Sequence, residues 1–429
     1  MASRDKKRNR TKAGRRPRYR SGNSPVSLRA TSMMPAPGAS TRYVRRRHVA
    51  TRRGRGLQQP LLPRVSVIMA VRNESSFIHR SLGTVLAQDY PVDRMEIIVA
   101  DGMSTDDTAA KIRELEAEHP HLQLIENPKK IVAPGLNACL AIAQGDVIVR
   151  VDGHTELEPD YVRQCVERLE QTGADNAGGK MHAIGNCRFG QSVAAATSSR
   201  FGVGGALFHY CDRETWVDTV YLGAWRRDVF ERIGLFDEHL VRNQDDEFNY
   251  RLRSDGGRIL LSPKIRSRYY NRSTPRALMR QYFQYGYWKV RVMQKHPAQM
   301  RPRQFVPPMF VAALCVGAGA SLWMATGRIL LSAIVFLYLL ANLLASVITA
   351  RKAGWRNLAR LSLAYAIIHL SYGAGLLVGL VRFRKRWHDR AGVVPRLPAR
   401  QPVAVKPAPA TAVVMPTEMD EADAALMFA

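Results

Sequence analysis

The sequence predicts an α/β fold with a mostly parallel sheet and flanking helices, followed by C-terminal transmembrane helices. Between Arg64 and Val151, short apolar runs alternate with segments of helical periodicity. This alternation is typical of a parallel sheet with helices on its faces. Three apolar segments of about 20 residues follow, and each is long enough to cross a hydrocarbon core of about 30 Å as a helix.

The individual elements follow from the local pattern. Val65–Val71 is a charge-free apolar run and predicts the first buried strand. Asp106, Asp107 and Thr108 are helix-start residues before a charged periodic segment. The further strands that we expect are Glu96–Ala100, Leu122–Glu126 and Val147–Val151, and the helices are Phe77–Gln88, Asp106–Glu118 and Gly135–Ala143.

The net charge of +28 is unevenly distributed along the chain. Residues 1–60 hold 18 Lys and Arg residues, one acid and few large apolar side chains, which predicts a disordered basic tail. Residues 61–263, the predicted α/β domain, hold 22 basic and 30 acidic residues. Residues 264–304 hold 11 basic residues and no acid, which predicts a basic amphipathic juxtamembrane segment. Anionic lipid therefore explains the charge better than the alternative, a nucleic acid.

The predicted membrane domain covers residues 305–381, with apolar segments at about 305–326, 329–350 and 361–381. Buried core helices are the alternative interpretation. The basic residues before the first segment and after the second place both regions in the cytoplasm. Three crossings would then place the basic cluster Arg382–Arg386 outside the cytoplasm, against the rule that basic flanking residues stay on the cytoplasmic side. Either one segment does not span or the rule is violated, and the small residues of Ser371–Gly375 favour a broken or re-entrant third helix. Residues 382–429 are expected to form a flexible tail.

Polar residues stand at the predicted strand ends, where open α/β sheets bind ligands. Asn73 and Glu74 follow the first strand, Asp101 follows the second, and Asp152 and His154 follow the fourth. A carboxylate accepts hydrogen bonds from ribose or base groups, and an Asp-x-His pair suits a divalent cation. Taken singly, each signal also fits an ordinary cap or turn.

Several other site classes are excluded by missing patterns. The sequence has no G-x-G-x-x-G fingerprint and no P-loop motif. Its five cysteines form no C-x-x-C pair, which argues against a disulfide scaffold or a cysteine-rich zinc module and favours a reducing compartment.

Taken together and in order, these motifs resemble the family 2 glycosyltransferases, enzymes of GT-A fold. The resemblance covers about residues 64–290. Within the family, the sequence is most similar to the succinoglycan-type exopolysaccharide glucosyltransferases. VDGH stands where the family has its D-x-D motif. The segments that carry the resemblance are VSVIMAVRNE (65–74), EIIVADGMSTD (96–106), GLN (135–137) with GD (145–146), VDGH (151–154), GAWRRDVF (223–230) with GLFDE (234–238), and QDDEFNYRL (244–252).

For the donor, the resemblance implies a pocket for a nucleotide sugar. Its residues would be Val71, Asn73, Glu74, Asp101 and Asp152. Asp152 would also bind a divalent metal, Mn²⁺ or Mg²⁺, together with His154, which replaces the family's second Asp. Because a protonated imidazole cannot ligate, this replacement makes metal affinity pH-dependent.

For the acceptor, the resemblance implies that Asp245 is the catalytic base. Gly223, Ala224, Asp246 and Glu247 would lie on the acceptor side of the site. Gln244 stands where the family usually has a Glu, so one charge beside the base is missing.

The function implied is inverting transfer of a single hexose, with glucose as the expected sugar, from a UDP-sugar to a lipid-linked (polyprenyl) saccharide in surface or exopolysaccharide synthesis. The expected location is the inner or plasma membrane, multi-pass, with a cytoplasmic catalytic domain, membrane lipids as partners and no nucleic acid. A processive synthase would carry Q-x-x-R-W before its membrane helices, and Gln281–Trp288 lacks the Arg-Trp pair. Processive synthesis and a non-catalytic membrane scaffold of the same fold are the alternatives.

Overall fold

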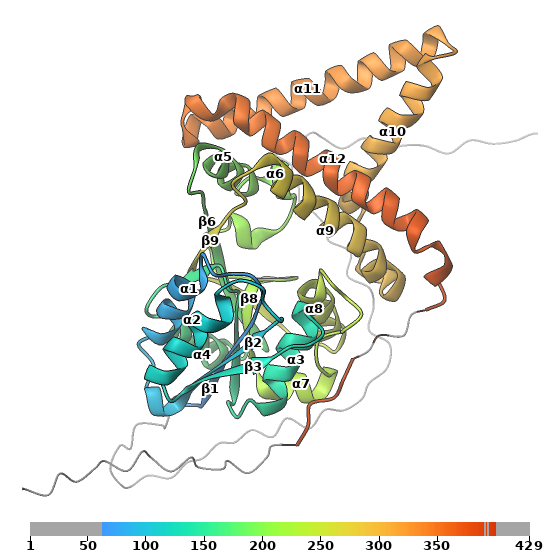
Figure 1. Cartoon of the computed structure of the whole chain (residues 1–429). Coiled ribbons are helices and arrows are strands. Elements are labelled where there is room, and N and C mark those ends of the chain that lie inside the picture. The colour runs from blue at the N-terminus through green and yellow to red at the C-terminus, as the bar shows by residue number, and fades with distance from the viewer. Residues whose placement is uncertain (1–61, 390–391, 393, 400–429) are drawn as a thin grey trace, which may run out of the picture. The chain divides into compact units, whose positions relative to one another are not determined.

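The computed structural model describes residues 62–389, 392 and 394–399. The predicted disordered tail of residues 1–60 lies outside the described residues. Nine strands form one mixed sheet in the order β3-β2-β1-β4-β8-β6-β9-β5, with β7 paired to β9 (Figure 1). Its parallel half contains β1 (Val65–Val71), β2 (Met95–Asp101), β3 (Leu122–Glu126) and β4 (Val147–Val151).

The second half of the sheet is mixed. Strand β8 (Tyr221–Arg226) pairs with β4 in the antiparallel direction, so the parallel part of the sheet ends at β4. Its remaining strands are β5 (Thr155–Leu157), β6 (Asn176–Ile184), β7 (Thr215–Val217) and β9 (Ile259–Tyr270). The prediction of a mixed sheet with flanking helices is confirmed, although its strand pairings are parallel and antiparallel in equal number.

Two apolar cores cover the two faces of the sheet. The first contains side chains of α1 (Ile78–Leu86), α2 (Thr108–Glu118) and α4 (Tyr161–Thr172). The second contains side chains of α3 (Val132–Ile142), α7 (Arg227–Ile233) and α8 (Gln244–Ser254). Because β1 and β4 bury side chains on both faces, their sequences are largely apolar rather than alternating.

The helix ends differ from the prediction for local reasons. α2 begins at Thr108 rather than Asp106, because the Asp106 carboxylate accepts hydrogen bonds from the Thr108 N–H at 3.1 Å and the Ser75 N–H at 3.2 Å. α3 begins at Val132, ahead of the predicted Gly135, because Pro134 is tolerated in the first turn of a helix.

Two predicted domain boundaries are corrected. The boundary between residues 263 and 264 falls inside β9, which pairs with β6 as far as Tyr270. The amphipathic helix of the 264–304 segment is α9 (Pro275–Lys295), and it packs on the sheet domain through ion pairs described below. The tail that we expected to be flexible from residue 382 includes Pro395, whose carbonyl accepts from the Leu235 N–H at 2.8 Å, and Leu397, which packs against the second core.

The remaining helices are α5 (Arg188–Thr197), α6 (Arg200–Val203), α10 (Val306–Ser321), α11 (Ala325–Ala353) and α12 (Leu358–Arg382). Within the part of the chain that the structure describes, three stretches are long and apolar enough to cross a membrane: Pro302–Ser321, Ala325–Ala353 and Trp355–Arg382. α12 runs without interruption through Ser371–Gly375, so the predicted break in the third helix is wrong.

Candidate active site

The carboxyl ends of β1 and β2 are joined by a network of loop hydrogen bonds. The Val71 carbonyl accepts from the Gly102 N–H at 2.8 Å. Asn73 adopts a left-handed backbone with φ 54°, and its Oδ1 accepts from the Thr105 N–H at 2.8 Å. The network holds Val71 and Asn73 beside the end of β2.

The Asp101 side chain forms its hydrogen bonds within the loop that follows β2. Its carboxylate is 6% exposed, and its two oxygens accept from the Ser104 N–H at 2.9 Å and the Ser104 hydroxyl at 2.5 Å. In this geometry Asp101 stabilises the loop that follows β2.

A buried arginine connects two of the predicted site carboxylates. Arg150, in β4, donates to Asp152 Oδ1 from Nη2 at 2.8 Å and from Nε at 3.2 Å. Its Nη1 lies 3.7 Å from Asp245 Oδ2 and has no hydrogen-bond partner among the described residues. The Arg150 side chain is 7% exposed, whereas those of Asp152 and Asp245 are 23% and 41% exposed.

The charges of this cluster stabilise one another. Burial opposes the charged guanidinium, but Asp152 and Asp245 outweigh it, so the pKa of Arg150 is raised. Burial likewise opposes the Asp152 carboxylate, but Arg150 and His154 outweigh it, so the pKa of Asp152 is lowered. Asp152 therefore stays ionised at neutral pH.

His154 lies against the end of β1. Its Nδ1 is 3.0 Å from Glu74 Oε1, and its ring meets the Tyr269 ring edge-on with centroids 5.3 Å apart. Gly153 packs so closely on the strand that a Cβ there would lie 2.9 Å from Val71 Cγ1. The turn thereby directs Asp152 and His154 into the same space.

That space is a cavity of about 1750 Å³ lined by Asp152, His154, Asp245 and Asp246. Asp245 and Asp246 enter it from the first turn of α8, and the Asp246 N–H donates to Asp245 Oδ1 at 2.9 Å. Its far end is apolar and is lined by residues of the C-terminal helices, including Phe310, Leu337 and Ile368. One cavity thus joins the polar strand ends to the apolar helices.

Comparisons with known proteins identify the family of the chain. The family model "Glycosyl transferase family 2" matches residues 66–234. The succinoglycan biosynthesis protein ExoA of Rhizobium meliloti is 31% identical over 328 residues, which are 75% of this chain and 96% of that protein. The chain belongs to glycosyl transferase family 2.

Other relatives extend the comparison. A dolichyl N-acetyl-alpha-D-glucosaminyl phosphate 3-beta-D-2,3-diacetamido-2,3-dideoxy-beta-D-glucuronosyltransferase of Methanococcus voltae is 25% identical, over 74% of this chain and 97% of that protein. Among solved structures, a mannosyltransferase of Pyrobaculum calidifontis in complex with GDP-Man and Mn²⁺ matches with 21% identity and a TM-score of 0.49, over 74% of this chain and 87% of that one. The chain is a family 2 enzyme of GT-A fold, related to exopolysaccharide and lipid-linked glycosyltransferases.

The family's metal is compatible with the residues at the strand end. No group of three His, Cys, Asp or Glu side chains that could hold a metal is found in the described part of the chain. However, no described residue donates a hydrogen bond to Asp152 Oδ2, and none forms a hydrogen bond with His154 Nε2. Mg²⁺ sites in nucleotide enzymes commonly use one or two carboxylates and complete their shell with substrate phosphates and water. Asp152 and His154 fit such a site.

Three predicted acceptor-side residues lie elsewhere in this family 2 enzyme. Gly223 and Ala224 belong to β8, where Ala224 is 0% exposed and pairs with Val149 of β4. Glu247 is 1% exposed and does not line the cavity. Of that group, only Asp246 lines the cavity, beside its ion-pair partner Lys289.

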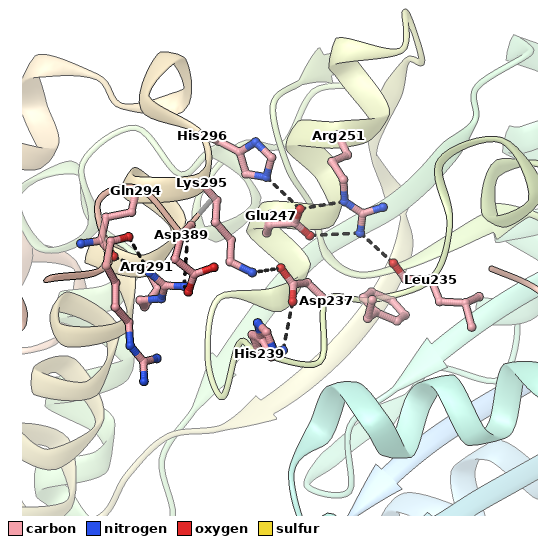
Figure 2. A network of polar contacts seen from close by, with 12 residues as sticks. Leu235, Asp237, His239, Glu247, Arg251, Arg291, Gln294, Lys295, His296 and Asp389 are labelled. Carbon is pink, nitrogen blue, oxygen red and sulfur yellow. Dashed lines mark hydrogen bonds and ion pairs between the residues drawn. The ribbon is translucent and has the colours of Figure 1, made fainter. Parts of the chain in front are cut away.

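Glu247 instead forms a buried ion network with α8 and the end of α9. It accepts from Arg251 Nε at 2.7 Å and lies 2.9 Å from His296 Nε2 (Figure 2). Arg251 also donates to the Leu235 carbonyl at 2.7 Å. Beside this group, Lys295 forms an ion pair with the buried Asp237. This network fixes α9 to the sheet domain.

The replacement Glu247→Gln is expected to remove a pH-dependent part of the stability. Burial raises the pKa of Glu247, but His296 and Arg251 outweigh it, so the net pKa lies below its usual value of 4.5. A lowered pKa stabilises the fold above the unfolded-state pKa, and this stability disappears as the pH falls through the folded-state value. At neutral pH we expect a loss of about 1.5–3 kcal/mol in the free energy of unfolding, typical of a charged hydrogen bond.

Thermal unfolding of the detergent-solubilised chain between pH 3 and 7 measures this effect. The gap between the natural chain and Glu247→Gln should be widest at pH 7 and narrow below about pH 4.5. Glu170→Gln, at an exposed position of α4, is the matched control and should follow the natural chain. Parallel curves for the natural chain and Glu247→Gln would contradict the role given to the ionised carboxylate.

Sequence reasoning missed two groups of site residues. Arg150 was counted as part of an apolar strand, although a single charge inside VIVRV directly before Asp152 was an available signal. Several basic residues of the 264–304 segment were assigned to lipid, yet they line the cavity: Arg272, Arg276, Arg280, Lys289, Arg301 and Arg303.

Proposed function

We propose that this chain transfers a single hexose, glucose first among the candidates, from a UDP-sugar to a polyprenyl-linked saccharide with inversion at the anomeric carbon. The observation that carries the proposal is that Asp152, His154 and Asp245 open into one cavity whose other end is formed by apolar helices. A nucleotide sugar and a lipid-linked acceptor need this combination of a charged and an apolar end.

In this proposal Asp245 is the general base. Its carboxylate takes the proton of the acceptor hydroxyl as that oxygen attacks the anomeric carbon, while the sugar–phosphate bond breaks on the opposite side. One such displacement inverts the configuration. Arg150 keeps Asp245 and Asp152 in a fixed relation, 3.7 Å and 2.8 Å from its guanidinium nitrogens.

The donor is proposed to lie at the ends of β1, β2 and β4. Val71, Asn73, Glu74 and Asp101 would shape the uridine pocket, with Asp101 acting through the loop that it stabilises. Asp152 and His154 would hold Mn²⁺ or Mg²⁺, which neutralises charge on the leaving diphosphate. Glu74 would orient the imidazole through its contact with His154 Nδ1 at 3.0 Å, as such partners do for metal-bound histidines.

The acceptor is proposed to enter from the helices. Arg276 and Arg280 are exposed, line the cavity and have no ion-pair partner among the described residues, so they suit the phosphates of a lipid carrier. The lipid chain would contact the apolar end near Phe310 and Leu337. The basic segments beside the helices support a cytoplasmic position of the catalytic domain at the inner or plasma membrane.

A donor and acceptor panel tests the function. Purified chain is incubated with UDP-, GDP- and dTDP-hexoses, with and without Mn²⁺, and with either a polyprenyl-linked or a free saccharide. We expect nucleotide release only from a UDP-hexose with Mn²⁺, and a product one sugar longer with inverted configuration by NMR. A chelator should abolish release.

Each other outcome contradicts a stated part of the proposal. Release only from GDP- or dTDP-hexoses would overturn the donor, and equal use of the free saccharide would overturn the lipid-linked acceptor. Long polymers would identify a processive synthase. No UDP binding in the presence of Mn²⁺ would identify a non-catalytic scaffold.

A further inference from the structure

The three apolar helices differ in how much of their surface the protein covers. In the most apolar 18-residue part of each stretch, 11% of the residues are buried in the first and second stretches, whereas 44% are buried in the third. α10 and α11 expose large apolar side chains such as Met309, Val316 and Ile329, at 68%, 71% and 70%. α12 exposes a single apolar stripe, with Leu363, Leu370, Val378 and Val381 on one face.

The opposite face of α12 is seated on α9 along nearly its whole length (Figure 1). At one end Leu278 of α9 packs with Leu361 and Tyr365 of α12. At the other end Val290 and Met293 pack with Leu376 and Phe383. Between these ends the two backbones touch, because a Cβ on Gly286 would overlap the Tyr372 carbonyl.

α9 itself belongs to the charged sheet domain. Its Lys289 pairs with Asp246 of α8, and its Lys295 pairs with the buried Asp237 (Figure 2). A membrane-spanning α12 would therefore carry α9 and these charges into the hydrocarbon core. Each charge costs several kcal/mol there.

Both ends of α12 also contact the sheet domain. In its first half, the Tyr365 hydroxyl lies 2.8 Å from Ser199 Oγ, and His369 Nε2 lies 2.8 Å from the Phe201 carbonyl. Past its end, Arg291 donates to Asp389 at 3.0 Å. The Leu235 N–H donates to the Pro395 carbonyl at 2.8 Å, so the chain returns to the second core.

We infer that α10 and α11 form the membrane-crossing pair and that α12 lies in the interface on the catalytic side. The Pro302–Ser321 stretch has 20 residues and α11 has 29, lengths of about 30 Å and about 43 Å at 1.5 Å per residue. Both are sufficient for a hydrocarbon core of about 30 Å. The turn between the two helices lies on the far side of the bilayer. Trp323, which is 86% exposed, and Arg328 are its interfacial anchors.

This topology removes the conflict over the last basic cluster. The α11 end meets the sheet domain where Ala350 packs with Val193 of α5. The basic residues at both ends of α12, Arg351 to Arg360 and Arg382 to Arg386, therefore lie on one side with the catalytic domain. Anionic headgroups on that side are the partner of α12, with its apolar stripe in the acyl boundary and its basic ends in the headgroup layer.

Cysteine labelling in sealed vesicles tests the topology without any assay of sugar transfer. Full-length chains with Cys187, Cys211 and Cys315 replaced by Ser each receive one cysteine, as Ser254→Cys, Thr326→Cys, Arg356→Cys or His388→Cys. In inside-out vesicles, an impermeant maleimide should label positions 254, 356 and 388 together, and position 326 only after detergent is added. A C-terminal green fluorescent protein on the otherwise natural chain should fluoresce, because it folds in the cytoplasm.

Protection of position 388 together with 326, and a dark C-terminal fusion, would mean that α12 spans and would overturn the inference. Labelling of position 326 alongside 254 would mean that α10 and α11 do not cross. The fusion keeps all native cysteines, so a folding defect in the serine background cannot by itself decide the outcome. Neither readout depends on the donor or acceptor proposed above.

Discussion

The replacement Asp245→Asn is expected to lower kcat for sugar transfer by about 10²- to 10⁴-fold, the contribution typical of a general base. An amide has the shape of the carboxylate but cannot take the proton of the acceptor hydroxyl. The side chain is 41% exposed and lies in the cavity, and the N–H of Asp246 holds its Oδ1 at 2.9 Å. The asparagine can keep this backbone contact, so the fold should be preserved.

The measurement separates chemistry from binding. Binding of UDP with Mn²⁺, followed by calorimetry, should remain within a few-fold of the natural chain, because Asp152 and His154 are unchanged. Asp255→Asn, at the exposed C-terminal end of the same helix, is the matched control and should keep full kcat. Full activity of Asp245→Asn would show that Asp245 is not the general base. Loss of UDP binding would show that Asp245 acts on the donor.

Much of the fold could be predicted because β1 and β4 are buried on both faces. Val65–Val71 and Val147–Val151 are therefore largely apolar, with Arg150 as the one charge, and the structure gives them the same limits. The individual strands of the mixed half were not predicted, and the second part of β9 shows one reason, because its residues alternate between buried and exposed. In β9, for example, Arg266 and Arg268 point outward to Asp160 and Glu158, and this alternation was counted as a basic strip.

The candidate site was predictable only where chain position determines side-chain direction. Asp152 and His154 leave the end of a strand two residues apart and enter one cavity. Asp245 and Glu247 are also two residues apart, but in a helix that step is about 200°, since 3.6 residues make one turn. Asp245 therefore faces the cavity and Glu247 faces the core, where Arg251 and His296 meet it. The assignment of Glu247 to the acceptor side, next to the proposed base Asp245, ignored this rotation.

The basic segments show why charge alone was ambiguous. Lys289 and Arg301 pair with Asp246 and Asp218, acids that lie distant in the sequence. Such partners are brought together by the tertiary fold, and composition does not reveal them. A strip of positive charge can therefore neutralise a protein's own acids, line its cavity and face lipid at the same time.

The replacement Arg150→Met is expected to lower kcat by at least about 10²-fold, because removing a positioning group displaces the base and the proposed metal-binding carboxylate together. Nη2 of the guanidinium lies 2.8 Å from Asp152 and Nη1 lies 3.7 Å from Asp245, and its side chain is 7% exposed. Breaking a buried ion pair by removing one partner also costs about 3–5 kcal/mol of stability. Arg150→Lys keeps the charge but not the two-atom contact with Asp152, so it should restore stability more than activity.

A purely structural role would give a different pattern, which a second buried arginine can reveal. Arg168 of α4 has a side chain that is 9% exposed and ion pairs with Glu167 and Glu214, but it does not line the cavity. Arg168→Met should lower the melting temperature while leaving kcat and UDP binding with Mn²⁺ unchanged. If Arg150→Met behaved in the same way, with full kcat per folded molecule, the guanidinium would only stabilise β4. We expect instead that kcat falls in the folded fraction and that UDP binding with Mn²⁺ weakens, because the Asp152 carboxylate loses the contact that orients it.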